Sequence, residues 1–272
     1  MPELPEVETI RRQLRPALVD REIGAVDAHS SEKFQPALEA AGTTITDLRR
    51  RGKYLIFDLD DGHEMLAHLG MTGSFRIDPS TTGSPDHERV GPHVRAVWQL
   101  DGGEDLIFRD IRRFGRLRVV PAGEYEGVPT LAAMGPEPLS DDFTGASLHH
   151  AVKRSTRAIK TQLLSQRPVA GVGNIYADEA LFLAGIHPRR SRVGSDRCDT
   201  LAQTIKDVIA QGIDNGGTTL RDYVDAAGDE GSNQHALHVY GRAGEPCDQC
   251  GETLRSIVLD ARTTCFCPAC QT

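Results

Sequence analysis

The chain has 272 residues, of which 26% are charged, and a formal net charge of −8. This length allows two hydrophobic cores and a smaller module. No apolar run is long enough for a membrane span and no signal-peptide pattern occurs, so we exclude a membrane protein and expect a cytoplasmic one. The net charge also argues against a chain that is basic throughout, so any nucleic-acid surface must be local.

Basic residues occur in groups that alternate with acidic segments at 58–64, 101–105, 124–142 and 225–230. Such runs are often only solvated faces, but their separation here predicts a bipolar molecule with one basic, DNA-facing side. The basic groups are Arg49, Arg50, Arg51 and Lys53; Arg109, Arg112, Arg113, Arg116 and Arg118; Lys153, Arg154, Arg157 and Lys160; and Arg189, Arg190 and Arg192.

The first element that the pattern predicts is an amphipathic helix near the start of the chain. Val7, Ile10, Leu14 and Leu18 fall on one helical face. Acidic residues precede arginines along this segment, which is the charge order that the helix dipole favours.

Short apolar segments with turn residues between them follow this helix, which predicts a β-sandwich over residues 1–120 with the N-terminal helix packed on it. Asp61-Gly62 and Asp101-Gly102-Gly103 are hairpin signals. The polar, Gly- and Pro-containing stretch 79–93 is expected to be a mobile loop. The predicted strands are 22–28, 43–50, 53–60, 64–69, 94–100, 106–109 and 117–120, with a short helix near 34–41.

The remaining chain predicts a linker at 121–142, a helical domain at 143–236 and a short-stranded, cysteine-rich module at 237–272. Proline and acidic residues mark the linker. The fold class is therefore α+β with several domains. The helices expected after the linker are 148–152, 159–164, 174–183 and 200–213.

Four cysteines form two Cys-x-x-Cys pairs with sixteen residues between them: Cys247, Cys250, Cys267 and Cys270. This is the spacing of a zinc ribbon, in which two tight turns supply four thiolates to one structural zinc ion. Disulfides are the alternative and do not suit a reducing cytosol. Cys265 lies beside the second pair and could compete as a ligand, whereas Cys198 is isolated.

Pro2 is followed directly by the carboxylate of Glu3. If Met1 is removed, Pro2 becomes a secondary amine, with a reference pKa of roughly 8 for an α-amine. Attack of such an amine on a sugar carbon gives a cationic iminium, which acts as an electron sink for eliminations. The alternative interpretation is an inert terminus.

The starting segment MPELPEVETIRRQL, the stretch GVGNIYADE at 171–179 and the terminal cysteines resemble the Fpg/Nei family of DNA glycosylases. The resemblance spans the chain. It implies a bifunctional DNA glycosylase/AP lyase with a helix–two-turn–helix domain, one zinc ion and damaged double-stranded DNA as its partner. We also expect a monomer that lies on the nucleoid.

The resemblance assigns site residues to this chain one by one. Pro2 is the nucleophile, Glu3 the general acid and Glu6 its support. Lys53 and Arg262 are the further catalytic residues. Lys53 lies near the phosphate and base of the lesion, and Arg262 binds the phosphates beside the lesion. The implied DNA-binding residues are His68, Arg113, Lys160 and Asn174, and the residues that enter the base stack are Met71, Arg112 and Phe114. Without the resemblance, Met71 and Phe114 would be interpreted as core residues.

The start MPELPEV favours oxidised purines, meaning formamidopyrimidines and 8-oxoguanine, as the substrate. Excision of oxidised pyrimidines and a non-catalytic binder of damaged DNA remain as alternatives. Two departures from the family pattern concern the segment 224–237, which has no aromatic residue where relatives carry one over the extruded base, and Cys265, where an aromatic residue is more frequent.

Overall fold

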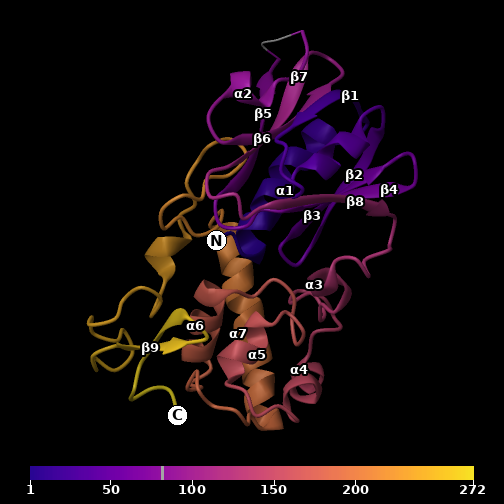
Figure 1. Cartoon of the computed structure of the whole chain (residues 1–272). Helices are drawn as coiled ribbons and strands as arrows, with labels where there is room; N and C mark the ends of the chain where they lie inside the picture. The colour runs from indigo at the N-terminus through magenta and orange to yellow at the C-terminus, as the bar shows by residue number, and fades with distance from the viewer. Residues whose placement is uncertain (81–82) are drawn as a thin grey trace. The chain divides into compact units, whose positions relative to one another are not determined.

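The structure, a computed structural model, describes residues 1–80 and 83–272 and divides into two compact units. The first, the N-terminal unit, contains residues 1–129 and 216–232. The second, the C-terminal unit, contains residues 130–215 and 233–272. The predicted α+β fold with a strand-rich first part and a helical later part is confirmed (Figure 1).

The N-terminal unit is built from eight antiparallel strands in the order β5-β7-β6-β1-β2-β3-β4-β8. Strand β1 joins the two halves, because its first residues pair with β2 and its later residues pair with β6, with a register shift between Ile23 and Val26. The strands are β1 (Arg21–Ala28), β2 (Thr44–Arg51), β3 (Tyr54–Leu59), β4 (His63–His68), β5 (Gly73–Pro79), β6 (Val94–Leu100), β7 (Glu104–Asp110) and β8 (Arg116–Pro121), with a 3₁₀ helix η1 (Gln35–Ala40) between β1 and β2.

Aromatic side chains from both halves meet in one core, which confirms the predicted sandwich. Phe57 of β3 lies 5.6 Å from Phe75 of β5, and Phe75 lies 4.8 Å from Phe108 of β7, measured between ring centroids. Strand β5 was not predicted, since it begins with glycine and ends with proline, but its inward residue Phe75 is only 1% exposed.

The segment expected to be a mobile loop, 79–93, contains structure where it is described. Residues 81–82 lie outside the described part of the chain. Pro79 still belongs to β5, and a short helix α2 (His87–Val90) follows. The backbone N–H of His87 donates to the Asp27 carboxylate at 2.7 Å, and so does its ring. These bonds attach α2 to β1.

Helix α1 (Leu4–Leu18) packs against the sandwich as predicted, and its apolar face belongs to the same buried core as the aromatic residues. Glu3 is its N-cap, and Glu3 and Glu6 form a reciprocal capping box. Glu8 anchors the next turn, since it accepts hydrogen bonds from Arg11 and Arg12 of the helix and from Arg50 of β2.

Residues 216–232 fold with the N-terminal unit, whereas the sequence placed them in the helical domain. Tyr223 enters the sandwich core, and Gln13 of α1 bonds Asp225 and the N–H of Ala226. Gly217 has a φ of +89° and lies so close to Glu6 that an added Cβ would come within 2.9 Å of its Cγ. Residues 216–232 show no periodic hydrophobicity, so their sequence does not indicate that they pack on α1 and the sandwich core.

The C-terminal unit is a set of helices followed by a hairpin. Its helices are α4 (Gly145–Val152), α5 (Ile159–Leu164), α6 (Asn174–Leu183), α7 (Ser195–Asp214) and a 3₁₀ helix η2 (Asn233–Ala236), and its strands are β9 (Arg255–Leu259) and β10 (Arg262–Phe266). Helix α7 begins five residues earlier than predicted. A short helix α3 (Pro129–Ala132) interrupts the expected linker. Within the described ranges, no helix combines the length and apolarity needed to cross a bilayer.

We predict that Glu8 makes the N-terminal unit sensitive to acid. Burial alone would raise the pKa of Glu8, but hydrogen bonds and charges from Arg11, Arg50 and Arg12 outweigh it and lower the pKa to about 2. The stabilisation is therefore present above about pH 4.5 and is lost as the pH falls toward 2. Glu8→Gln should lower the free energy of unfolding at pH 7 by about 2 kcal/mol.

Denaturant unfolding of the wild type and Glu8→Gln at several pH values tests this. The gap between the two should close between pH 4.5 and 2, whereas the exposed Glu39→Gln control should match the wild type throughout. A gap that does not change with pH would contradict the assignment.

Candidate functional site

The first candidate site lies at the start of α1, where Pro2, Glu3 and Glu6 come together. All three are buried, and Glu3 and Glu6 are only 2% and 1% exposed. The backbone N–H of Glu3 donates to Glu6 Oε2 at 2.7 Å, and the N–H of Thr218 donates to Glu6 Oε1 at 2.7 Å. Both carboxylate oxygens of Glu6 are thus occupied, and the first of these bonds fixes the backbone of Glu3 directly after Pro2.

Lys53 stands in the turn between β2 and β3, and this turn is tied to α1. Arg50 donates to Glu8 of α1 at 3.0 Å and to the carbonyl of Gly52 at 3.1 Å. Lys53 itself is 7% exposed, and its charge acts on His68 at the end of β4. The structure therefore supports Lys53 from the same helix that carries Pro2 and Glu3.

His68 is held as a neutral ring. Burial, together with the positive charges of Lys53 and Arg116, lowers the pKa of His68 to about 4. Its Nδ1 accepts the N–H of Gly70 at 3.1 Å, and its ring packs on Tyr54 at a centroid distance of 4.9 Å. With Nδ1 acting as acceptor, the ring proton must lie on Nε2, which makes that atom a hydrogen-bond donor at neutral pH.

The three residues expected to enter the base stack are on two adjacent loops and are exposed. Met71 is 36% and Phe114 49% exposed, and the Arg112 guanidinium lies 5.1 Å from the centroid of the Phe114 ring. These values overturn the core interpretation of Met71 and Phe114. Exposed Arg113 is next to them with a φ of +56°, and its carbonyl accepts a bond from Lys33.

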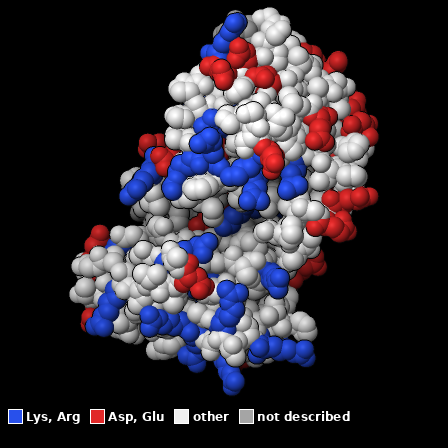
Figure 2. All heavy atoms as spheres, in the orientation of Figure 1, with Lys and Arg blue, Asp and Glu red and all other residues white. Residues whose placement is uncertain are grey.

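Charge is unevenly distributed over the N-terminal unit. On the face shown in Figure 2, many of its Lys and Arg side chains gather in a band, while many of the visible Asp and Glu side chains lie along another edge. Exposed Arg112, Arg113, Arg116 and Arg118 come from the β7–β8 region. This unit therefore offers a basic surface despite the net charge of −8.

The four predicted zinc ligands converge in the C-terminal unit. Their sulfur atoms all lie within 4.8 Å of one another, with 3.9 Å between Cys247 and Cys270 and 3.6 Å between Cys250 and Cys267. Zn–S bonds of about 2.3 Å in a tetrahedron require S–S separations of about 3.8 Å. The residues fit one structural zinc ion, as predicted. Cys265 is buried and lies outside this group.

The zinc module includes the hairpin β9–β10, and polar contacts fix it on α5 and α6. Asp260 and Ala261 form its two-residue turn with φ values of +46° and +59°, and the exposed Arg262 follows directly. Such a turn matches the twist of the strands. The hairpin's contacts are Thr161 Oγ1 to Asp260, Lys160 Nζ to Thr264 Oγ1, Asn174 Nδ2 to the Thr263 carbonyl and the Cys265 N–H to Asp178.

The expectation that Lys160 contacts a DNA phosphate needs correction. Its side chain is 0% exposed, and Nζ lies 2.6 Å from the Asp178 carboxylate, itself 0% exposed at its side chain. Its ammonium also donates to Thr264 at 2.8 Å. A phosphate cannot reach this ammonium without breaking a buried ion pair, which is strongly unfavourable. Lys160 therefore holds the hairpin on α5 and α6.

Asn174 begins α6, directly after the predicted glycine turn. Gly171 donates to Gln166 Oε1 at 2.7 Å, and Gln166 Nε2 donates to the Val172 carbonyl at 2.6 Å. These bonds fix the turn that directs the first amides of α6. Half-buried Asn174 reaches the hairpin, so the helix start and Arg262 belong to one rigid arrangement.

Two supporting residues were not predicted. Glu179, 2% exposed, accepts the N–H groups of His238, Val239 and Tyr240, and Arg242 binds Asp248 and Glu245. Both residues stabilise the segment 238–248, which leads into the zinc module. Glu179 is within the GVGNIYADE motif, but a carboxylate in a helix gives no sign of its backbone partners.

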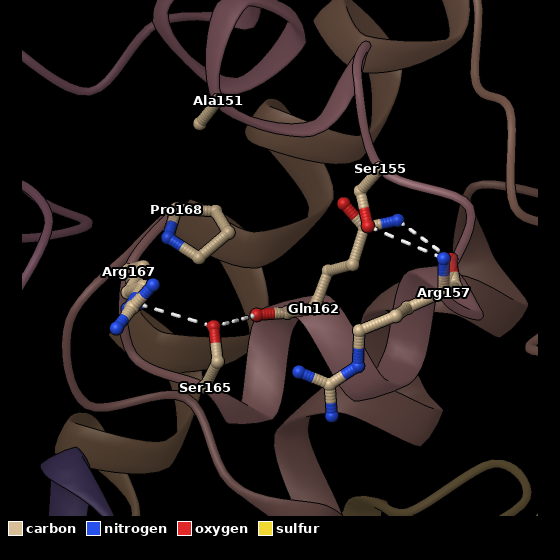
Figure 3. Close-up of a pocket in the computed structure, with 7 residues that line it drawn as sticks. All are labelled: Ala151, Ser155, Arg157, Gln162, Ser165, Arg167 and Pro168. Carbon is tan, nitrogen blue, oxygen red and sulfur yellow. Dashed lines mark hydrogen bonds between the residues drawn. The ribbon is translucent and has the colours of Figure 1, made fainter.

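A separate open pocket of about 500 Å³ lies between α4 and α5 in the C-terminal unit. Figure 3 shows its polar groups bonded to one another: Gln162 donates to the Arg157 carbonyl and Ser165 to the Gln162 carbonyl. None of the site residues predicted from the sequence lines it.

Comparison with known proteins matches the whole chain. Family models described as the formamidopyrimidine-DNA glycosylase N-terminal domain, its H2TH domain and the zinc finger found in FPG and IleRS match residues 1–117, 134–224 and 244–272. A Deinococcus radiodurans formamidopyrimidine-DNA glycosylase is 45% identical, covering 100% of this chain and 97% of its own.

Two solved structures are similar along nearly all of their length. The MutM (Fpg) protein of Thermus thermophilus has a TM-score of 0.90 and 42% identity, covering 99% of this chain and 98% of its own. The Lactococcus lactis Fpg in complex with DNA containing Fapy-dG has a TM-score of 0.87 and 34% identity, covering 99% and 100%.

We predict that zinc depends on four cysteines and not on Cys265. Cys267→Ser should lose most of the bound zinc and lower the thermal stability of the C-terminal unit, because binding of a structural zinc ion contributes folding free energy. Cys265→Ser, a change at the neighbouring buried thiol, should keep about one zinc per chain. Metal analysis by mass spectrometry measures both, and zinc loss in Cys265→Ser would contradict the ligand set.

We also predict that His68 does not titrate between pH 5.5 and 8. Nitrogen-15 NMR of the histidine side chains should show His68 as the Nε2–H tautomer throughout this range, because its pKa is lowered to about 4. A titration near the ordinary value of 6.5 would show that the ring is solvated and not held as described.

Proposed function

Since this chain belongs to the formamidopyrimidine-DNA glycosylase family and is a DNA glycosylase of base-excision repair, we propose that it excises oxidised purines from duplex DNA and then cuts the strand as a lyase. The observation that carries the proposal is the placement of Pro2 beside the buried carboxylates of Glu3 and Glu6 at the start of α1. Once Met1 has been removed, the nitrogen of Pro2 is a secondary amine next to an acid, which suits both steps.

Pro2 is the proposed nucleophile once Met1 has been removed. Its nitrogen lone pair forms a bond to C1′ of the damaged nucleotide, and the bond from C1′ to the base breaks. Ring opening leaves an iminium between Pro2 and C1′. Loss of a C2′ proton then expels the 3′ phosphate, and a second elimination expels the 5′ phosphate. Water finally releases Pro2 as the free amine.

Glu3 is the proposed general acid. It would donate a proton to the deoxyribose ring oxygen as the sugar opens, so that Pro2 can attack C1′ without a full negative charge developing on that oxygen. Glu6 cannot share this task easily, because its two oxygens already accept N–H bonds from Glu3 and Thr218. Glu6 is therefore assigned to support.

Lys53 and the neutral Nε2–H of His68 are the proposed contacts to the phosphates near the lesion. In the C-terminal unit, Arg262 is the proposed phosphate ligand of the zinc hairpin, and Asn174 and the amides at the start of α6 are further ligands. Met71, Arg112 and Phe114 are proposed to fill the gap left by the extruded nucleotide, with Arg113 beside them on the backbone.

Oxidised purines, as formamidopyrimidines and 8-oxoguanine, are the proposed substrate class. The support is the 45% identity to a formamidopyrimidine-DNA glycosylase and the similarity to a relative solved with Fapy-dG DNA. Oxidised pyrimidines are the competing class, since the segment 224–237 lacks an aromatic residue. We further propose that the protein acts as a monomer on the nucleoid in the cytoplasm.

The test is trapping with borohydride. Protein whose intact mass confirms the loss of Met1 is incubated with an 8-oxoguanine duplex, a formamidopyrimidine duplex and an oxidised-pyrimidine duplex. We expect a covalent adduct that peptide mass spectrometry maps to Pro2, with the purine lesions reacting fastest. A form that retains Met1 has no secondary amine and should give no adduct.

Glu3→Gln separates the two steps. It should slow base excision by about 100-fold or more, the usual contribution of a general acid, yet still form the adduct with a preformed abasic site. Exposed Glu22→Gln is the matched control and should behave as wild type. If correctly processed protein gives no adduct on any duplex, the lyase mechanism is rejected.

A further inference from the structure

We propose that Asp110 and Thr72 are positioning residues that set the three side chains entering the DNA stack, an inference that rests on the proposed function. Met71, Arg112 and Phe114 come from two loops, the β4–β5 loop (69–72) and the β7–β8 loop (111–115). We call these three side chains the wedge. Long exposed side chains can fill a gap in DNA only if their backbones are fixed beforehand, because ordering them on binding costs free energy.

A chain of hydrogen bonds beneath the wedge ends at one carboxylate. The N–H of Arg112 donates to Thr72 Oγ1 at 3.0 Å, and Thr72 Oγ1 donates to Asp110 Oδ1 at 2.6 Å. The N–H of Gly115 donates to Asp110 Oδ2 at 2.7 Å. Asp110 is 0% exposed and Thr72 6% exposed, so neither side chain exchanges these bonds for water.

The positions of these bonds match the positions of the wedge. Thr72 follows Met71 in the chain, Arg112 provides one of the N–H groups, and Gly115 follows Phe114. The Asp110 carboxylate therefore binds the chain neighbours of Met71 and Phe114 directly, and it is linked to Arg112 through the Thr72 hydroxyl. The hydroxyl of Thr72 acts as donor and acceptor at once, a combination that neither valine nor another apolar residue supplies.

Backbone contact between the two loops completes the arrangement. A Cβ on Gly70, whose φ is +64°, would meet the carbonyl carbon of Phe114 at 2.4 Å and the nitrogen of Gly115 at 2.5 Å. A Cβ on Gly115 would come within 2.9 Å of Asp110 Oδ2 and 3.2 Å of the His68 carbonyl. The loops thus touch directly and cannot shift independently. The wedge and the His68 donor are set by the same packing.

Asp110 is also fixed to the sheet from below. Its N–H donates to the carbonyl of His93 at 2.9 Å, and its carbonyl accepts from Arg95 Nε at 2.9 Å. It pairs with Gly73 at the first position of β5. Because the backbone of Asp110 is held by the sheet and its carboxylate binds both loops, Asp110 fixes both loops relative to the sheet. A residue that belongs only to a loop could not do this.

Thr72→Val tests the proposal, because valine keeps the shape of threonine and removes the hydroxyl. We expect excision of the damaged base from duplex DNA to fall by about tenfold, in line with one lost hydrogen bond to a charged group. Cleavage of a preformed abasic site in single-stranded DNA has no stack to enter, so it should stay within about twofold of wild type. Thr72→Ser, which restores the hydroxyl, should recover duplex excision.

Thr43→Val is the matched control. Thr43 is also 6% exposed in the same unit and its hydroxyl makes one hydrogen bond, to the Ala40 carbonyl, away from the wedge. It should lower stability without affecting duplex excision selectively. Thermal unfolding of every variant reports folding, and Thr72→Ala provides a second hydroxyl deletion that relieves any crowding from valine.

Insertion of the wedge is followed directly with 2-aminopurine beside a tetrahydrofuran abasic analogue in duplex DNA. Wild type and Thr72→Ser should change its fluorescence on binding, and Thr72→Val should change it less at saturating protein. Equal duplex excision and equal fluorescence in Thr72→Val would overturn the inference, as would an equal loss on single-stranded DNA. A wild type inactive on every substrate would instead reject the proposed function.

Discussion

The carboxylate of Glu6 joins two parts of the N-terminal unit that lie far apart in the chain. One of its oxygens caps the start of α1 through Glu3, and the other holds the N–H of Thr218, which is 212 residues away in the chain. Tyr223 adds its ring to the core, and burial, reinforced by the Glu6 charge, raises its pKa. A carboxylate without partners at this depth would be costly. A change that displaces either the start of α1 or the segment around Thr218 is therefore expected to destabilise the whole unit.

Much of this architecture follows from local sequence. The face formed by Val7, Ile10, Leu14 and Leu18 specifies α1, and the Asp-Gly turns specify two hairpins of the sandwich. The two Cys-x-x-Cys pairs define the zinc cluster because metal geometry leaves little choice once four thiolates are close. In each case the pattern that predicts the structure lies within a short segment of sequence, or in a set of metal ligands whose spacing is specific.

What the sequence did not reveal depends on distant partners. Lys160 would be interpreted as a surface cation until Asp178 and Thr264 are seen to enclose it. Strand β5 is not evident in the sequence because Gly73 and Pro79 stand at its ends. The segment 216–232 binds partly through backbone amides and close glycine contacts, which leave no pattern in the sequence. The exposure of Met71 and Phe114 followed only from the resemblance, since apolar residues in loops beside a core are ordinarily buried.

The discontinuity of the N-terminal unit has a consequence for its synthesis. The ribosome makes the strands and α1 first, but Thr218 and Tyr223 emerge only after residues 130–215. At synthesis rates of about 5 to 20 residues per second, making residues 130–215 takes roughly 4 to 17 seconds. Glu6 lacks its second partner throughout this interval. The start of α1 therefore reaches its final packing only after Thr218 and Tyr223 have been made.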